Sequence, residues 1–416
     1  MKLKYFAILF VTALTLASCS EDDLDSKSIF SGSSQTVEND FDKWLQKNYV
    51  EPYNIEFKYR FEFKESNTTY NLAPAEYDKS IALAKLTKYL WIESYEELMG
   101  KDFIRTYAPK ILNLIGSVAY NSNGGVVLGT AEGGMKIVLY NVNNLNYQQL
   151  DMEFLNYWFF NTMHHEFAHI LHQTKNYPTD FNEISKADYQ SSSWVNLTDE
   201  EALALGFVNN YASSETQEDF VQTIAFYVTM SDEAWADLLD QAVVPVTDEN
   251  GDPVYELDKR GNYVYETDAE GNYIPAVDKQ GNPIYVTDEN GDIVYEKDKD
   301  GNFILAKDEE GNPIVMRDEE GNPVKKVDDF GNPVFDVDFE TGQVYYVYEY
   351  EKVPMIEYQK KYLKDYTGQE KILQKLAMVK DYLKGSWGIN LDKLHQIVQR
   401  RQQEVAEGKL DLQSLN

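Results

Sequence analysis

The chain has 416 residues, 43% of them hydrophobic and 14% aromatic, which is enough for two or three domains around a sizeable core. Its formal net charge is −32. A surface of that sign repels phosphate backbones, so we expect no nucleic-acid partner, whereas cationic substrates or surroundings would suit it.

The first residues are typical of an export signal that ends in a lipid anchor. Two early lysines precede an apolar run over residues 6–16, which has signal-peptide length and is too short to span a bilayer. The run leads into Leu16-Ala17-Ser18-Cys19, which resembles the lipobox of bacterial lipoproteins. We therefore expect residues 1–18 to be removed and Cys19 to carry the lipid. Cys19 is the only cysteine, so no internal disulfide is possible. The alternative is an ordinary signal peptide with an incidental cysteine.

Residues 19–38 are interpreted as the lipid anchor and a flexible tether, because the stretch is polar and rich in serine. Glu21, Asp22 and Asp23 follow the cysteine almost directly. Acidic residues in that position resemble the signal that sends some Gram-negative lipoproteins to the outer face of the outer membrane. The predicted location is therefore the outer membrane, with the protein exposed at the cell surface.

The rest of the chain predicts an α+β fold, since helices and strands are mixed along it. Helices are expected over residues 41–47, 75–98, 152–173 and 218–230, and again from about residue 355, on the basis of apolar residues three and four positions apart. Strands are expected over residues 54–63, which alternate polar and apolar, and 135–140, which follow a Gly-Gly turn. The predicted organisation is one domain in two parts, 39–245 and 350–416, with an insertion at 246–349.

The insertion repeats with a period of ten between residues 248 and 347. Nine of the ten units begin with Asp-x-x-Gly-Asn or Asp-x-x-Gly-Asp, and the seventh position is always Val or Ile. Aspartate can brace a turn and glycine can take a positive φ, which predicts a type I turn followed by a left-handed glycine and a short strand. We interpret the segment as a β-hairpin repeat array, a meander or repeat unit that carries about half of the net negative charge.

Calcium binding is the alternative for these aspartate turns. The unit Asp298-Lys299-Asp300-Gly301-Asn302 offers suitable oxygen ligands. It lacks the closing glutamate of a calcium helix-loop-helix and the doubled glycine of the calcium β-roll. The turns are therefore expected to be structural.

Four of the five histidines lie within residues 164–172. His165 and His169 are one helical turn apart, so both imidazoles can reach one tetrahedral zinc ion. Glu166 lies beside them and can act as a general base on a water molecule that the metal activates. The alternative is an apolar core helix with two histidines that serve only structure.

A third ligand must come from elsewhere in the chain. His172 lies about 10 Å along the helix axis from the first histidine, too far to share the ion easily. The best candidate is Glu218, at the acidic end of an otherwise apolar helix. Asp219 competes with it as a ligand or as an outer partner. Glu200 and Glu201 are weaker candidates because they follow Thr198 as in a helix cap.

These residues together resemble the substrate import-associated zinc metallohydrolase lipoproteins, also described as zinc-binding metallopeptidases. The resemblance rests on the lipobox, on residues 41–45 and 52–55, on the His165–His169 motif, on Tyr211 with 218–220, and on 387–392. It covers nearly the whole mature chain except the ten-residue repeats, which depart from the family.

The resemblance implies a zincin fold of the gluzincin type, with zinc held by His165, His169 and Glu218. It also implies Glu166 as the base and Tyr211 as the group that stabilises the oxyanion, although the residues alone leave an ordinary aromatic role for Tyr211 open. The resemblance also implies a surface lipoprotein encoded beside a TonB-dependent outer-membrane transporter and a glycan-binding lipoprotein, which are the partners this suggests.

The leading functional hypothesis is hydrolysis of peptide or protein substrates at the cell surface. It predicts an edge strand, for which residues 135–140 are the candidate, that pairs with an extended substrate. One alternative is a binding accessory of a nutrient-import complex with an inactive zinc site, although Glu166 argues against it. Another is a metallo-amidase that acts on glycan-linked or peptidoglycan-linked amides.

Overall fold

The computed structural model describes residues 38–415, apart from 68, 121–124, 128 and 133–134. It divides into two compact units, Met1–Val243 with Tyr366–Asn416, and Val244–Asp365. The predicted signal peptide and Cys19 lie outside the described residues. Within the part that the structure describes, no helix has both the length and the apolar character to cross a bilayer.

A four-stranded sheet in the first unit has the order β1-β2-β6-β5. The strands are β1 (Glu56–Lys58), β2 (Ile111–Leu114), β6 (Lys136–Leu139) and β5 (Gly129–Glu132). The first three are parallel, and β5 runs antiparallel to β6 at one end of the sheet. The strand expected at residues 135–140 is therefore present but internal, and the expectation that it forms the edge is wrong. The strand expected over 54–63 is confirmed only for residues 56–58.

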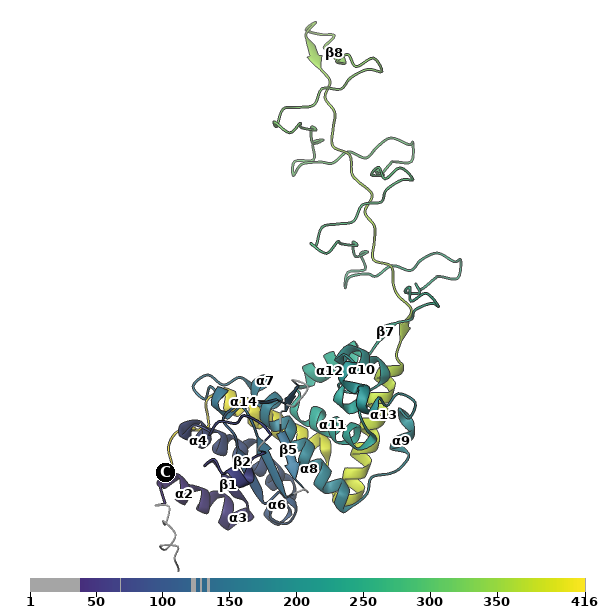
Figure 1. Cartoon of the computed structure of the whole chain (residues 1–416). Helices are drawn as coiled ribbons and strands as arrows, with labels where there is room; N and C mark the ends of the chain where they lie inside the picture. Colours follow the sequence, from purple (N-terminus) through teal and green to yellow (C-terminus); the bar gives the residue numbers. More distant parts are fainter. Residues whose placement is uncertain (1–37, 68, 121–124, 128, 133–134, 416) are drawn as a thin grey trace, which may run out of the picture. The chain divides into compact units, whose positions relative to one another are not determined.

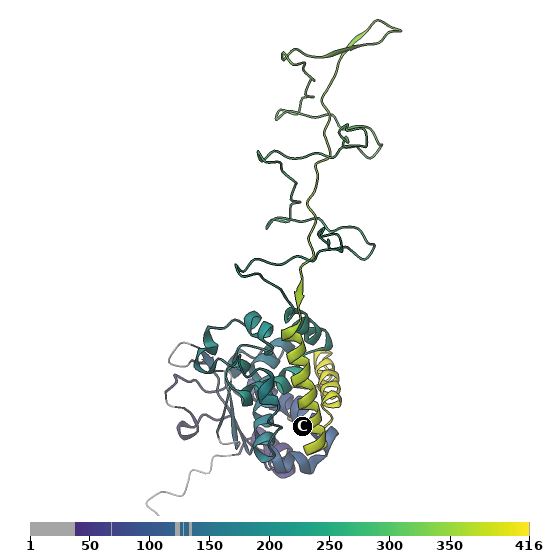
Figure 2. The same cartoon turned by 90° about the vertical axis from the view of Figure 1, so that its right-hand side faces the viewer.

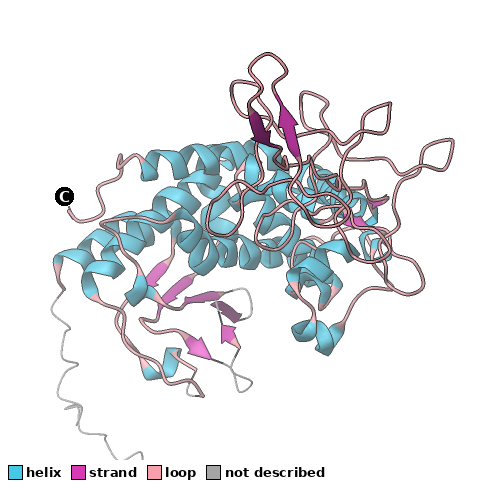
Figure 3. Ribbon diagram, turned by 90° about the horizontal axis from the view of Figure 1, so that it is seen from above, coloured by secondary structure: helices cyan, strands magenta, loops and turns pink. Residues whose placement is uncertain are grey.

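Helices form most of the first unit, as Figure 3 shows. The N-terminal helical segments are α2 (Asp40–Leu45), η1 (Gln46–Val50), α3 (Glu51–Tyr53), α4 (Tyr77–Thr87), η3 (Lys88–Ile92), α5 (Glu93–Met99) and α6 (Lys101–Tyr107). The central ones are α7 (Met152–Leu155), η5 (Asn156–Phe160), α8 (Asn161–Thr174), α9 (Phe181–Ile184), α10 (Asp199–Leu205), α11 (Thr216–Thr229) and α12 (Asp232–Gln241). The helices expected near residues 41–47, 75–98, 152–173 and 218–230 are all confirmed.

Helix α8 lies in the centre of the hydrophobic core. Its Phe167 is fully buried and packs edge to face against the rings of Trp91 and Tyr95, at centroid distances of 5.5 and 4.9 Å. Helix α11 packs along α8 and contributes the buried Phe220 and Val221. Because apolar side chains surround α8, the polar residues that it carries are held in fixed positions.

The edge strand β5 contacts α8 through a glycine. A Cβ atom on Gly129 would lie 2.3 Å from Cγ2 of Thr162 in α8 and 3.1 Å from the carbonyl oxygen of Val138. We therefore expect Gly129→Ala to lower the free energy of unfolding by roughly 1–3 kcal/mol. Gly385→Ala is the matched control, because Gly385 has open space around it in the helical turn η8 (Leu383–Trp387) and alanine favours a helix. Urea unfolding measures both variants, and equal stability of the two would contradict the contact.

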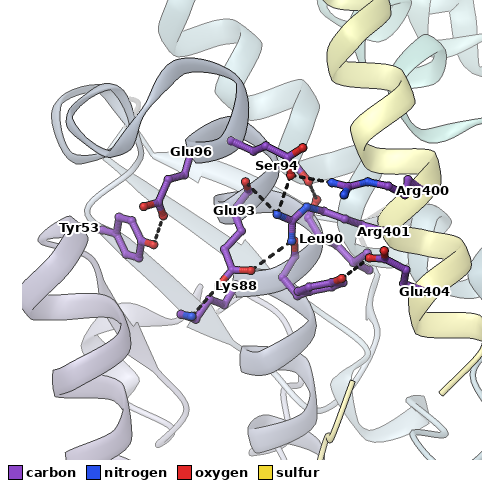
Figure 4. A network of polar contacts seen from close by, with 11 residues as sticks. Tyr53, Lys88, Leu90, Glu93, Ser94, Glu96, Arg400, Arg401 and Glu404 are labelled. Carbon is purple, nitrogen blue, oxygen red and sulfur yellow. Dashed lines mark hydrogen bonds and ion pairs between the residues drawn. The ribbon is translucent and has the colours of Figure 1, made fainter. Parts of the chain in front are cut away.

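The last two helices, α13 (Thr367–Tyr382) and α14 (Leu391–Ala406), belong to the same unit as the N-terminal half. Arg401 of α14 binds Glu93 and Glu97 of α5 at 3.1 and 2.9 Å, and Arg400 binds Glu97 at 2.6 Å. Figure 4 shows this network, in which Lys88 also reaches Glu93. The first unit is thus completed by a segment that follows the second unit in the chain.

The second unit begins and ends with the paired strands β7 (Val244–Pro245) and β10 (Lys364–Asp365). Between them, the repeats form successive hairpin turns of one kind. In the first, Oδ1 of Asp248 accepts hydrogen bonds from the backbone N–H groups of Asn250 and Asp252, at 2.8 and 3.0 Å. Gly251 has φ +86°, as the predicted left-handed glycine requires. The carboxylate therefore braces the turn.

Each hairpin is bonded to one long extended segment, residues 347–363. The N–H of Leu363 donates to the carbonyl of Val254, and the N–H of Glu256 donates to the carbonyl of Lys361, at 2.9 and 2.8 Å. Ten residues later, the N–H of Lys361 donates to the carbonyl of Val264. Every ten-residue repeat therefore advances two residues along this segment. Figures 1 and 2 show the hairpins following one another along it, up to the terminal hairpin of β8 (Phe335–Val337) and β9 (Val344–Tyr346).

Two expectations for this region need correction. Residues 350–365 were expected to begin the C-terminal helices, but they belong to the second unit and are extended, and α13 begins only at Thr367. The physical reason is that the repeats present a row of free carbonyl and N–H groups, which a strand can pair with and a helix cannot. In addition, the hairpins do not form a meander, because each pairs with the long segment and no backbone bond joins one described hairpin to the next.

Candidate metal centre

Three side chains from two helices converge on one point. Nε2 of His165 and Nε2 of His169, both on α8, lie 3.1 Å apart. Oε2 of Glu218, in the first turn of α11, lies 3.2 Å from the first nitrogen and 3.3 Å from the second. Among the described residues, these three form the one group of His, Cys, Asp and Glu side chains with the spacing of a metal site.

The triangle fits zinc. A tetrahedral zinc ion with bonds of roughly 2.0–2.2 Å separates its ligands by roughly 3.3–3.6 Å, close to the observed spacings. Two imidazoles and one carboxylate are also a donor set that catalytic zinc sites use, with the fourth position left for water or substrate. His165, His169 and Glu218 are therefore the residues that could hold such an ion.

Local structure explains why these atoms meet. His165 and His169 are four residues apart on a continuous helix, so their rings lie on the same face, with centroids 4.7 Å apart. Glu218 occupies the N-terminal turn of α11, where the helix dipole favours a negative charge. The apolar contact between α8 and α11 then brings the carboxylate to the histidines.

The carboxylate of Glu218 is held in its ionised form. Burial acts to raise the pKa of Glu218, but hydrogen bonds with His165 and His169 outweigh burial and hold the pKa well below its usual range. An anionic oxygen is the form that a metal ligand requires.

Glu166 shows the opposite behaviour. Burial raises the pKa of Glu166 to about 7, the charge of Glu218 adds to this effect, and His169 opposes it. A carboxyl group with a pKa near neutrality can both accept and release a proton at physiological pH. Its place in the chain, directly after His165, keeps it beside the converging donors.

Tyr211 lies next to the same centre, in the short helical turn η7 (Tyr211–Ser213). Its ring centroid is 6.1 Å from that of His165, and Trp194 packs edge to face against it at 5.0 Å. Burial and the neighbouring Glu218 raise the pKa of Tyr211 above its usual value. The phenol therefore remains protonated and can donate a hydrogen bond at neutral pH.

The competing carboxylates lie elsewhere. Asp219 points away from the histidines into the core, where Oδ2 is 2.6 Å from Nζ of Lys375 and 2.8 Å from the hydroxyl of Tyr189. Glu201 accepts the backbone N–H of Thr198 at 2.9 Å and so forms the predicted capping box of α10. Neither Asp219 nor Glu201 joins the group of three.

Sequence reasoning missed Lys375, the partner that directs Asp219 inward. Lys375 is on α13, more than 150 residues after Asp219, and only 1% of its side chain is exposed. A lysine in an amphipathic helix normally lies on the surface, and nothing in the neighbouring sequence distinguishes this one.

Comparison with known proteins places the chain in a family. Residues 34–268, more than half of the chain, match the model of a family described as "putative zinc-binding metallo-peptidase". A crystal structure of a protein from Bacteroides caccae, described in the same words, is 30% identical in sequence. The similarity covers 91% of this chain and 96% of that one, with a TM-score of 0.54. No protein with curated annotation matches the chain. The chain therefore belongs to the family described as putative zinc-binding metallo-peptidases.

Proposed function

We propose that the protein is a zinc metallopeptidase that hydrolyses peptide bonds, anchored to the cell surface by lipid. The observation that carries the proposal is the triangle of His165, His169 and Glu218, with donor separations of 3.1–3.3 Å, next to a glutamate whose pKa burial raises to about 7. A zinc site that serves only structure needs no such carboxylate.

Each residue of the centre has a distinct role in this proposal. Zinc bound by the two histidines and Glu218 would polarise the scissile carbonyl and lower the pKa of the attacking water. Glu166 accepts a proton from that water and passes it to the departing amine. Tyr211 donates a hydrogen bond to the oxygen of the carbonyl as negative charge develops on it.

The position of the edge strand β5 favours a peptide as the substrate. It ends the sheet next to β6 and contacts α8, the helix that carries both histidines. An extended peptide can pair with such an edge through its own backbone, so that substrates of varied sequence can bind. The net charge of −32 favours peptides with basic side chains.

The location and partners belong to the same proposal. Cys19 is the proposed lipidation site, and the acids that follow it favour the outer face of the outer membrane. The resemblance to import-associated zinc metallohydrolase lipoproteins supports a role in nutrient import, beside a TonB-dependent transporter and a glycan-binding lipoprotein.

The unit Val244–Asp365 is interpreted as a β-repeat array inserted into a zincin-like domain.

Activity is expected to fall on the acid side, with a midpoint no higher than about 7, because Glu166 must be ionised to accept a proton. Below the pKa, kcat/KM should decline about tenfold per pH unit, as the ionised fraction does. The positive charge of bound zinc can move this limb only to lower pH, since it favours the carboxylate. The measurement is the pH profile of kcat/KM for the zinc-loaded enzyme. A limb well above pH 7 would contradict the role of Glu166.

The first test is zinc stoichiometry on the soluble form that begins at Ser20, with cleavage of an unfolded protein substrate followed in the same sample. We expect one zinc per chain and cleavage that a chelator stops and added zinc restores. One zinc without cleavage of the protein substrate would contradict the peptidase activity and leave the metal site standing. Absence of zinc would overturn the proposal as a whole.

A further inference from the structure

His172 is the fourth histidine on α8, and it contacts His169 on the side that faces away from the other two donors. Its Nε2 lies 2.9 Å from Nδ1 of His169, the nitrogen that points away from Glu218. The residue is only 4% exposed. His172 thus lies too far along the helix axis to join the three converging donors, yet it is hydrogen bonded to one of them.

The chemistry of His169 determines the direction of this hydrogen bond. A neutral imidazole carries one proton, and the nitrogen that faces a metal must present its lone pair. With a metal at the centre, Nε2 of His169, which faces His165 and Glu218, would present its lone pair, and the proton would lie on Nδ1. In that state Nδ1–H of His169 would donate to Nε2 of His172, 2.9 Å away. His172 would in turn carry its own proton on Nδ1.

Aromatic side chains hold His172 in place. The ring of Tyr177 lies edge to face with it at 5.5 Å, and that of Phe220 at 6.2 Å. Tyr177 and Phe220 are themselves stacked face to face, with centroids 4.3 Å apart. Phe220 is two residues after Glu218 on α11. Helix α11 therefore supplies both the carboxylate of Glu218, which faces the centre, and the ring of Phe220, which packs against His172.

We propose that His172 is a positioning residue, which fixes the tautomer and ring orientation of His169 so that Nε2 faces the metal. The proposal rests on the zinc site of the proposed function. The outer partner of a metal-bound histidine is commonly a carboxylate or a backbone carbonyl. Here a neutral imidazole takes that place, so the centre gains an oriented ligand without a further negative charge.

His165 shows why this contact matters. Its Nδ1 is buried and has no hydrogen-bond partner among the described residues. The outer nitrogens of the two histidines therefore differ: Nδ1 of His165 has packing alone around it, whereas Nδ1 of His169 is hydrogen bonded to His172. Loss of the bond to His172 would leave both ligands without an outer partner.

Two nearly isosteric substitutions test the proposal. His172→Gln keeps an acceptor oxygen at the position of Nε2, whereas His172→Met has similar length and no comparable acceptor. Zinc affinity is measured by competition with a chelator, and the visible spectrum of the cobalt-loaded proteins reports the geometry of the ligands. Thermal unfolding of the metal-free proteins shows whether either substitution damages the fold.

We expect His172→Met to weaken zinc binding roughly 10–100-fold and to alter the cobalt spectrum, with metal-free stability close to that of His172→Gln. His172→Gln should recover most of the affinity and the spectrum. Unchanged affinity in His172→Met, or equal losses in both variants, would overturn the role of His172 and leave the zinc site intact. A wild-type protein that binds no zinc would overturn the proposed function itself.

Discussion

Replacing Glu166 with glutamine is expected to lower the rate of peptide hydrolysis by roughly 10²–10⁴-fold while zinc binding stays unchanged. Glutamine has nearly the same shape as glutamate, so the helix and its two histidines remain in place. Its neutral amide cannot accept a proton from water and does not titrate. The measurements are kcat/KM on an unfolded protein substrate and zinc stoichiometry on the same sample.

Two further variants make this result specific. His165→Ala removes one corner of the donor triangle and should lose zinc and hydrolysis together. Glu201→Gln is the matched control, because glutamine also serves in the capping box of α10 and the residue lies outside the centre. Glu166→Gln with wild-type kcat/KM, or Glu201→Gln with an equal loss, would contradict the assigned base.

Replacing Lys375 with methionine is expected to lower the free energy of unfolding by roughly 3–5 kcal/mol. The side chains of Lys375 and Asp219 are 1% and 0% exposed, and their charges lie 2.6 Å apart. Lys375 also donates to the carbonyl oxygen of Gly206 at 2.7 Å. Methionine fills the space but leaves the aspartate buried without a counter-charge. Denaturant unfolding of the metal-free protein measures the loss.

The loss should grow with pH, and the sign follows from linkage. Burial raises the pKa of Asp219 above its usual value even though Lys375 opposes this, so removing the lysine raises the pKa further. In the unfolded chain Asp219 then loses its proton at a lower pH than in the folded protein. The free energy of unfolding therefore falls as the pH rises above the pKa of about 3.9 that an aspartate has in an unfolded chain. A deficit in Lys375→Met that is larger at pH 5 than at pH 8 would contradict this account.

Lys371→Met is the matched control on the same helix. Lys371 forms an ion pair with Asp188 at 2.7 Å, but the two side chains are 23% and 24% exposed. Water screens such a pair, so its loss should cost less than about 1 kcal/mol. The double variant Lys375→Met with Asp219→Asn should recover part of the stability, because the buried charge is then absent.

The helix that carries His165 and His169 could be predicted from the sequence because its signals are local. Apolar residues over 152–173 predict a buried helix, and the spacing of His165 and His169 requires only regular helical geometry. The choice between Glu218 and Asp219 could not be made in that way. Adjacent residues on a helix point about 100° apart, and which one faces the histidines depends on Lys375, a contact made by the fold.

The edge strand β5 was missed because its sequence lacks a strand pattern. Residues 129–132 read Gly-Thr-Ala-Glu, with one small and no large apolar side chain, and strand formation there depends on pairing with β6. Residues 350–365 were misread for a related reason. The segment follows the two-residue period of a strand, with Tyr350, Pro354, Ile356, Tyr358 and Tyr362 at alternate positions. Its pairing partners, however, lie in the repeats, far away in the chain.

The pairing in the second unit has a consequence for how this protein can change length. One hairpin occupies ten residues of repeat and two residues of the long segment that pairs with all of them. A duplication of ten residues alone would produce a hairpin with no free carbonyl or N–H group to join. The number of repeats can therefore evolve only in step with insertions of two residues in a separate stretch of the gene. The segment 347–363 thus sets how many hairpins the unit can hold.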